Sequence, residues 1–200
     1  MFGIRSAGRQ FATALRALVV ATIVLGVAYP LVITGAAQLA LPSQANGSLV
    51  DAADAPVGSA LIGQSFADAD GNALPQYFQS RPSAVGYDAA SSGGSNLGPE
   101  NPDLVAQLAA RISAVAALDG VSPDEVPPDA VTASASGLDP HISPEYAQEQ
   151  VNRVAAARGL DASAVRSLVD ENTEGRMLGF LGEPTVNVLK VNIALDALRG

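Results

Sequence analysis

The chain has 200 residues, enough for one ordinary domain and an appendage, and 48% of them are hydrophobic. It contains no cysteine, which excludes disulfides and thiolate metal sites. The net charge is −9, but residues 51–200 hold all 20 acidic residues and eight basic ones, a net charge of −12. This acidity argues against nucleic acid and anionic lipid as partners of that part.

The first predicted element is a membrane-spanning helix at residues 17–37. This run is uncharged and apolar, and at about 1.5 Å per residue its 21 residues reach roughly 31 Å, the thickness of the bilayer hydrocarbon. Arg5, Arg9 and Arg16 precede it with no acidic residue, so the positive-inside rule keeps residues 1–16 in the cytoplasm. We therefore expect a linker at 38–56 and an extracytoplasmic domain at 57–200, in the plasma membrane of a bacterium.

A cleaved secretory signal is the alternative for this segment, with a small-residue cleavage site near Gly35. The apolar run is longer than the 7 to 15 residues that are usual in such signals, which favours the membrane span. Both interpretations export the remainder of the chain.

One face of the predicted span carries small and polar residues at every fourth position. Such a row lets another helix approach closely and predicts a docking face, although these residue types are also common in membrane helices generally. The row consists of Thr22, Gly26, Pro30 and Thr34.

The exported part reads as a mixed α+β domain. Residues 41–56 are polar and turn-rich, 57–66 fit a short strand and turn, and 84–102 form a long loop. Three helices are predicted after the N-caps Asn101, Ser143 and Asp161, the first two closed by Gly120 and Gly159. Their expected apolar positions are Leu104, Val105, Leu108, Ile112 and Val115; Ala147, Val151, Val154 and Ala155; and Val165, Leu168 and Val169. Residues 185–191 alternate as a strand does and lead into a helical turn at 193–198.

The only histidine, His141, raises the question of catalysis. A serine hydrolase would need it to act with Ser134 or Ser136 and Asp139, but Asp139 is too close in sequence to orient the imidazole from behind, and no G-x-S-x-G motif is present. A metal site would need more ligands than Asp139 and His141. We expect a turn ahead of a helix, with no catalytic residue and no metal.

The glycine-rich loop 91–96 (SSGGSN) offers main-chain N–H groups to an anion. A phosphate-binding loop also needs a nearby lysine, and the only lysine is Lys190. An extracytoplasmic domain would moreover be separated from cytoplasmic ATP. The loop is therefore a weak candidate for nucleotide binding, and we expect no firmly bound cofactor.

Several motifs in colinear order closely resemble the C subunit of the Kdp potassium-transporting ATPase. They are YPL at 29–31, GSALIGQSF at 58–66, YFQSRPSA at 77–84, SGGSNL at 92–97, VTASASGLDPHISP at 131–144, LGEP at 181–184 and VNVL at 186–189. The resemblance runs from about residue 17 to residue 198. One departure is Ala135, where the family favours glycine; a positive φ at this position would strain the turn.

The resemblance implies a non-catalytic subunit of an ATP-driven, high-affinity potassium importer. Its partners would be a channel-like subunit and a P-type ATPase subunit, and it would assemble the complex and raise the ATP affinity of the ATPase subunit, where ATP itself binds. Asn96, Asp139, His141 and Ser143 lie in the matching motifs and become candidates for partner contacts or turns. A free exported binding or scaffold module and an anchored serine hydrolase remain as alternatives.

Overall fold

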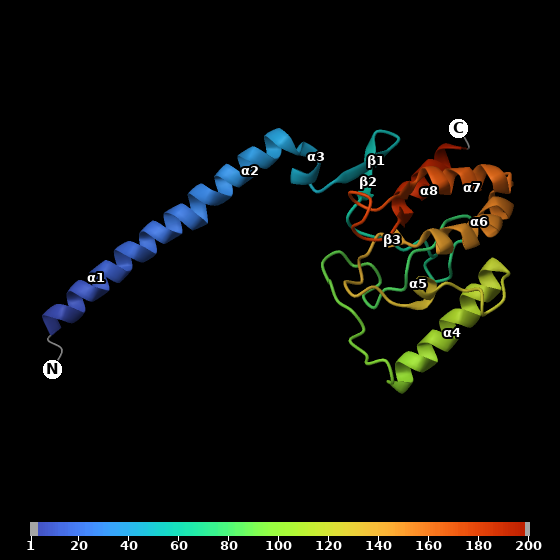
Figure 1. Cartoon of the computed structure of the whole chain (residues 1–200), viewed down its shortest axis with the longest axis horizontal. Coiled ribbons are helices and arrows are strands. Elements are labelled where there is room, and N and C mark those ends of the chain that lie inside the picture. The colour runs from blue at the N-terminus through green and yellow to red at the C-terminus, as the bar shows by residue number, and fades with distance from the viewer. Residues whose placement is uncertain (1–3, 199–200) are drawn as a thin grey trace. The chain divides into compact units, whose positions relative to one another are not determined.

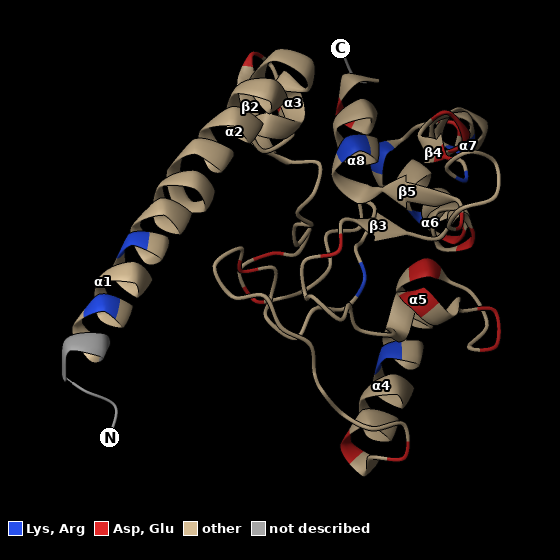
Figure 2. Cartoon of the chain, turned by 60° about the vertical axis from the view of Figure 1, so that its left-hand side comes forward, with Lys and Arg blue, Asp and Glu red and all other residues tan. Residues whose placement is uncertain are grey.

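The computed structural model describes residues 4–198 and divides into two compact units, Met1–Ser48 and Leu49–Gly200 (Figure 1). The first unit is helical, with α1 (Ile4–Ala21), a π-helical stretch η1 (Thr22–Ala28), α2 (Tyr29–Ala40) and the short α3 (Pro42–Ala45). Residues Ala7–Ala40 are long and apolar enough to cross a membrane, with a mean hydropathy of 2.3 over their most apolar stretch. The predicted span 17–37 lies inside this helix. The arginines of the helix lie in its N-terminal half, before the span (Figure 2).

The π-helical stretch has an identifiable cause in the sequence. Pro30 has no N–H, and its ring clashes with the carbonyl one turn earlier, so the helix must widen or bend just before it. The widening occurs at η1, where Tyr29 N–H donates to Val24 C=O, five residues back. The chain continues as a helix on both sides of the proline.

The second unit begins with a hairpin whose first strand lies in the segment predicted as turn-rich, 41–56, and whose second strand reaches into the strand and turn predicted at 57–66. Strands β1 (Leu49–Ala52) and β2 (Ala55–Ser59) pair antiparallel, with an irregularity between Val50 and Asp51. Ala53 and Asp54, with φ of 49° and 64°, make the tight turn between them. The turn could not be predicted from the sequence, because alanine rarely adopts a positive φ and is not a typical turn residue.

A three-stranded antiparallel sheet and four longer helices form the rest of the unit, which confirms the α+β class. The sheet order is β3 (His141–Ile142), β5 (Thr185–Asn187) and β4 (Thr173–Glu174). The helices are α4 (Pro102–Asp119), α6 (Pro144–Arg158), α7 (Ala162–Glu171) and α8 (Val188–Ala197), with a short α5 (Pro128–Val131) between the first two. In sequence, α6 and α7 are joined by a tight connection, and they pack against each other (Figure 1).

The predicted helix boundaries are confirmed by their capping bonds. Asn101, Ser143 and Asp161 accept hydrogen bonds from the first-turn N–H groups of Asp103, Tyr146 and Ser163. Gly120 and Gly159 close α4 and α6 in the left-handed conformation, with φ of 72° and 66°.

The predicted strand at 185–191 is wrong in its second half. Strand β5 ends at Asn187, whose side chain accepts a hydrogen bond from Lys190 N–H and so caps α8. The apolar residues that looked alternating instead have helical spacing, and they bury Val188, Leu189, Val191 and Leu195.

One core lies between α6, α7, α8 and the sheet. Its buried members include Phe78, Val151, Val154, Val165, Val169, Val186 and Leu195. From α4, the predicted residues Leu108, Ile112 and Val115 pack against this core, whereas Val105 remains 55% exposed. Residues 84–101 form the predicted loop without a helix or strand.

Candidate functional site

Five segments that are distant in sequence are joined by hydrogen bonds around strands β3 and β5. Gly63 N–H donates to Leu138 C=O at 2.8 Å, and Asn187 Nδ2 donates to Ala60 C=O at 2.9 Å. Ser134 N–H donates to Pro82 C=O, and Gly93 N–H donates to Ser136 C=O. These bonds join five of the seven motifs singled out in the sequence, namely 58–66, 77–84, 92–97, 131–144 and 186–189.

The turn at 134–139 is the centre of this assembly. Ser134, 2% exposed, accepts hydrogen bonds at Oγ from Gly137 N–H at 3.0 Å and Asp139 N–H at 3.4 Å. Gly137 has a φ of 69°, and a Cβ there would lie 2.4 Å from Val85 Cγ2 and 2.7 Å from Gly93 O. Only glycine fits this position.

Ala135 does not strain the turn, contrary to the concern raised by the sequence. It is not among the residues with a positive φ, since the left-handed position of this motif is Gly137. Its main chain instead faces the glycine-rich loop, where a Cβ on Gly94 would lie 2.8 Å from Ala135 O.

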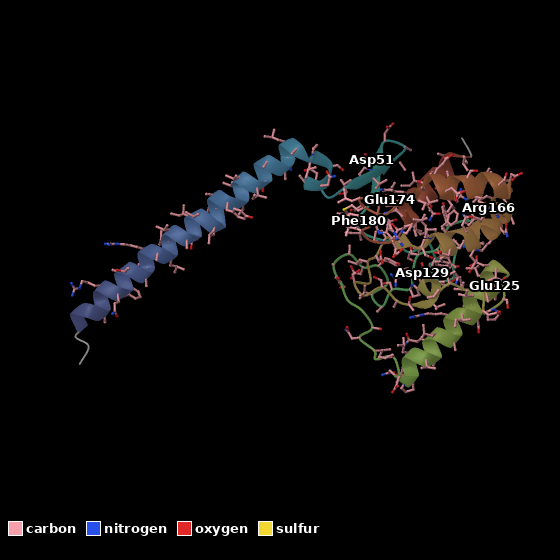
Figure 3. The ribbon with its side chains drawn as sticks, in the orientation of Figure 1. Asp51, Glu125, Asp129, Arg166, Glu174 and Phe180 are labelled. Atoms are coloured by element: carbon pink, nitrogen blue, oxygen red, sulfur yellow. The ribbon has the colours of Figure 1, made fainter. Side chains whose placement is uncertain are left out.

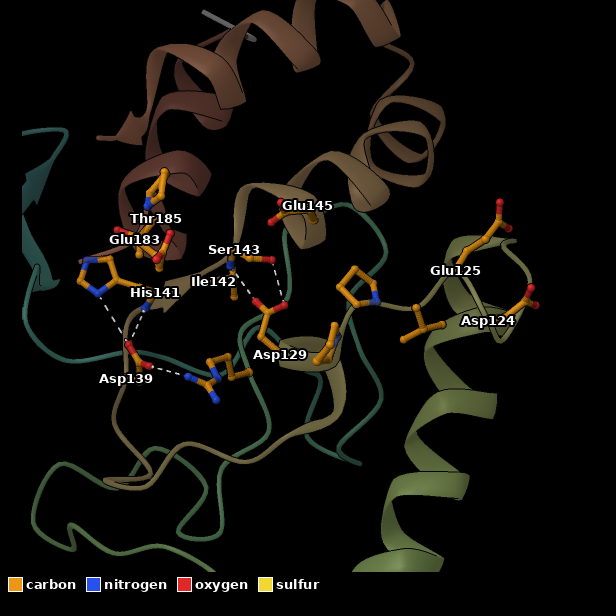
Figure 4. A pocket seen from close by; sticks show the side chains of 15 residues that line it. Asp124, Glu125, Asp129, Asp139, His141, Ile142, Ser143, Glu145, Glu183 and Thr185 are labelled. Carbon is orange, nitrogen blue, oxygen red and sulfur yellow. Dashed lines mark hydrogen bonds and ion pairs between the residues drawn. The ribbon is translucent and has the colours of Figure 1, made fainter. Parts of the chain in front are cut away.

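Asp139 organises the polar centre of the site. Its Oδ2 lies 3.0 Å from Arg81 Nη1, and its Oδ1 accepts a hydrogen bond from His141 N–H at 3.0 Å (Figure 4). Partial burial of the carboxyl opposes its ionisation, but the imidazole and N–H of His141 and the charge of Arg81 outweigh burial and lower the pKa of Asp139. Asp139 is therefore an anion held between the side chains of Arg81 and His141.

Ser143 is fixed as firmly as Asp139. Its N–H and Oγ–H donate to the two carboxylate oxygens of Asp129, at 2.6 and 2.8 Å, while Oγ also caps α6 through Tyr146 N–H (Figure 4). The serine therefore ties α5 to the start of α6, and its capping role agrees with the prediction.

An open pocket of about 610 Å³ lies beside these groups (Figure 4). Six of its fifteen lining residues are acidic, and Arg81 and His141 are the basic members; the acidic residues are Asp124, Glu125, Asp129, Asp139, Glu145 and Glu183. A second pocket of about 640 Å³, lined by Leu61, Ile62 and residues of the 133–140 turn, shares Arg81 and Asp139 with the first. The ion pair of Arg81 and Asp139 thus lines both pockets.

The other predicted site residues are less engaged. His141 belongs to β3, paired with Asn187, and its Nδ1 lies 3.6 Å from Asp139 Oδ1. Ser134 Oγ and Ser136 Oγ lie 3.1 Å from each other, and within residues 4–198 neither hydroxyl bonds to the imidazole. Among these same residues, no group of three or more His, Asp or Glu side chains is arranged to hold a metal ion.

Asn96 lies exposed in the glycine-rich loop with a φ of 53°, a conformation that asparagine tolerates better than most residues. Of the main-chain N–H groups in this loop, Gly93 N–H is already used by Ser136 C=O. Ser91 N–H likewise donates to Asp88 C=O, so at least two donors of the predicted anion nest are occupied by the protein itself.

Two buried arginines hold the 77–84 motif in place, and sequence reasoning missed both. Arg153 binds Asp119 at 2.5 Å and donates to Pro75 C=O and Tyr77 C=O at 2.7 and 2.9 Å. Arg158 donates to Gln76 C=O at 2.6 Å and lies over the ring of Tyr77. For Arg158 a signal was available, because it lies on the predicted apolar side of its helix and a charge there needs buried partners. Arg153 lies nearly opposite that apolar side and gave no such signal.

The predicted row in the membrane helix is exposed along its whole length in this chain. A Cβ on Gly26 would lie 3.7 Å from Thr22 Cγ2, which places these two positions side by side. Pro30 and Thr34 follow in α2, beyond the π-helical stretch that changes the angular spacing.

Residues 11–197 match the family described as KdpC, K+-transporting ATPase, c chain. Potassium-transporting ATPase KdpC subunits are similar over nearly their full length. The one from Kineococcus radiotolerans is 55% identical over 94% of this chain and 93% of its own. The one from Polaromonas naphthalenivorans is 55% identical over 90% of both, and the one from Methylococcus capsulatus is 51% identical over 95% and 98%.

The chain belongs to the KdpC family. The family predicted from the sequence motifs is thereby confirmed, and the match includes both the apolar helix and the α+β unit. One apolar helix of membrane-spanning length followed by this domain fits a single-pass membrane protein.

Proposed function

We propose that this chain is a non-catalytic subunit that assembles and stabilises a potassium-transporting ATPase in the plasma membrane. The observation that carries the proposal is the family match over residues 11–197, in a chain with one apolar helix of membrane-spanning length. The proposed partners are the channel-like subunit and the P-type ATPase subunit. The N-terminus is cytoplasmic and the domain extracytoplasmic, because arginines precede the span and no acidic residue does.

The membrane helix docks through Thr22, Gly26, Pro30 and Thr34, while the outer domain sits over the outer mouth of the potassium pathway. The side where the five motifs meet, around Asp139 and His141, then contacts the partners, together with Asn96 and Ser143. Their rigid hydrogen bonding suits a preformed interface, since little ordering remains to be done on binding.

Leucine at Gly26 or at Thr34 tests the docking face. Each substitution should weaken co-purification with the pump subunits about three- to fifteen-fold, the range expected for losing one polar or close-packed helix contact. Ala36→Leu is the matched control, since an α-helix turns by about 100° per residue and Ala36 therefore faces away from Thr34. Unchanged yield for both variants contradicts the docking face.

The chain also raises the affinity of the ATPase subunit for ATP, by coupling through partner helices and without touching the nucleotide. The pump subunits prepared without this chain should therefore show a higher KM for ATP than the complete complex. Protease treatment of intact cells should remove the domain from outside. A domain protected inside the cell and binding ATP alone contradicts both the topology and this indirect coupling.

A further inference from the structure

One main-chain carbonyl in the membrane helix has no donor within its own helix. Tyr29 N–H donates to Val24 C=O, whereas in a regular α-helix it would donate to Leu25 C=O. The donor five residues after Leu25 would be residue 30, but this is a proline without an N–H. Neither the α-helical nor the π-helical hydrogen-bond pattern therefore supplies an N–H donor to Leu25 C=O.

Side chains of the same helix do not replace the missing donor. A serine or threonine hydroxyl can fold back onto the carbonyl three or four residues earlier. The residues at these distances from Leu25 are Ala28, which has no hydroxyl, and Tyr29, whose hydroxyl lies at the far end of a rigid ring. The one such back-bond near this region joins Thr13 Oγ1 to Arg9 C=O at 3.0 Å, three turns away.

At the position of Leu25 a missing main-chain hydrogen bond is strongly destabilising. With a rise of about 1.5 Å per residue, the carbonyl lies roughly 12 Å from the start and 18 Å from the end of the uncharged run 17–37, near the bilayer centre. Water is absent at this depth, and an unsatisfied main-chain group there costs several kcal/mol. Proline-interrupted membrane helices are tolerated because neighbouring helices supply the missing bonds.

The chain is open to such a neighbour at this level. Gly26 follows Leu25 directly and has no side chain, and every residue of η1 is uncovered by the rest of the chain. Glycine permits a second helix to come close enough for a side chain to reach the main chain.

We propose that Leu25 C=O accepts a hydrogen bond, in the assembled complex, from the hydroxyl or amide side chain of a transmembrane helix in another subunit. A neutral donor fits this depth because a charged one carries a larger desolvation penalty. The inference rests on the proposed docking of the membrane helix, and it adds the chemistry that the partner must present.

The first test is Pro30→Ala in the full chain. Alanine supplies an N–H at residue 30, so the helix can resume regular pairing and satisfy Leu25 C=O by itself. Capture of the pump subunits should weaken about three- to fifteen-fold, corresponding to one interhelical hydrogen bond. The control Pro42→Ala, at the start of α3 and outside the span, should leave capture unchanged.

The second test observes the carbonyl directly. A 13C=18O label placed at Leu25 of the full chain should give an amide I band at lower frequency in the assembled complex than in the chain alone in the same lipid. An unshifted band, or full capture by Pro30→Ala, overturns the inference. If the unaltered chain captures no pump subunit, the proposed function fails. If it captures them and Gly26→Leu weakens capture, but the Leu25 band is unshifted or Pro30→Ala captures fully, only the Leu25 bond is refuted.

Discussion

Arg153→Met offers the sharpest test of how the domain is held together. The arginine side chain is 5% exposed, and its partner Asp119 is 1% exposed. Methionine preserves much of the length and volume but removes the charge and the donors to Pro75 C=O and Tyr77 C=O. Asp119 is then a buried anion without its cation, which typically costs about 3–5 kcal/mol.

For a domain of about 150 residues, each kcal/mol shifts the melting temperature by roughly 2–4 °C, so we expect Tm to fall by roughly 6–20 °C. Circular dichroism of the full chain in detergent measures this shift. Adding Asp119→Leu to Arg153→Met should recover part of the loss, because the unpaired anion is removed with its partner. If the single variant loses less than about 1 kcal/mol of unfolding free energy, or the double variant recovers nothing, the stabilising role of the Arg153–Asp119 ion pair is refuted.

Two further predictions concern stability. Burial, followed by the nearby charge of Asp119, raises the pKa of Glu149 to about 7, so the folded state holds a proton that the unfolded chain releases above about 4.5. Stability should therefore fall as the pH rises from about 5 to about 8, and Glu149→Gln should flatten this decline in melting curves; a variant with the slope of the original chain contradicts the assignment. Gly137→Ala should lose about 2–4 kcal/mol in chemical denaturation, from a positive φ and a clash with Val85 and Gly93. Gly86→Ala, at a φ of 62° with open space around it, should lose only about 1 kcal/mol, and equal losses would mean that the contact at Gly137 is not tight.

Local chemistry made the helices predictable. The three N-caps bond to residues only two or three positions away, so a short stretch of sequence is enough to predict them. They are Asn101, Ser143 and Asp161. The same locality misled the interpretation of residues 185–191. There the alternation of valine and polar residues fitted a strand, but Asn187 starts a helix by capping it.

Long-range anchors could not be predicted from the sequence. Asn192 binds both main-chain groups of Phe78 across 114 positions, and Arg153 reaches Tyr77 across 76. Neither partner is recognisable from residue type or spacing. The candidate site was recovered only in part for the same reason: its motifs were visible, but the pairing of Arg81 with Asp139 depends on the folded chain.

The π-helical stretch shows a third kind of difficulty. Pro30 predicts that one main-chain hydrogen bond of the helix is missing, because proline has no N–H. The sequence does not predict whether the helix bends or widens at this point. Widening changes which main-chain carbonyl loses its donor. It therefore also changes the depth in the membrane at which a partner helix would have to supply a hydrogen-bond donor.

The anchoring of the 77–84 motif by side chains has a consequence for its motion. Phe78 N–H is held by Asn192 Oδ1 at 2.9 Å and Gln79 N–H by Gln150 Oε1 at 2.6 Å, in a stretch that is neither helix nor strand. Since these acceptors belong to the buried faces of α8 and α6, the two amides should exchange with deuterium only when the domain unfolds globally. By contrast, Phe180, 70% exposed and labelled in Figure 3, lies in a small turn on the surface whose amides are free to open locally. Two irregular stretches of one domain would thus fall at opposite ends of its exchange timescale.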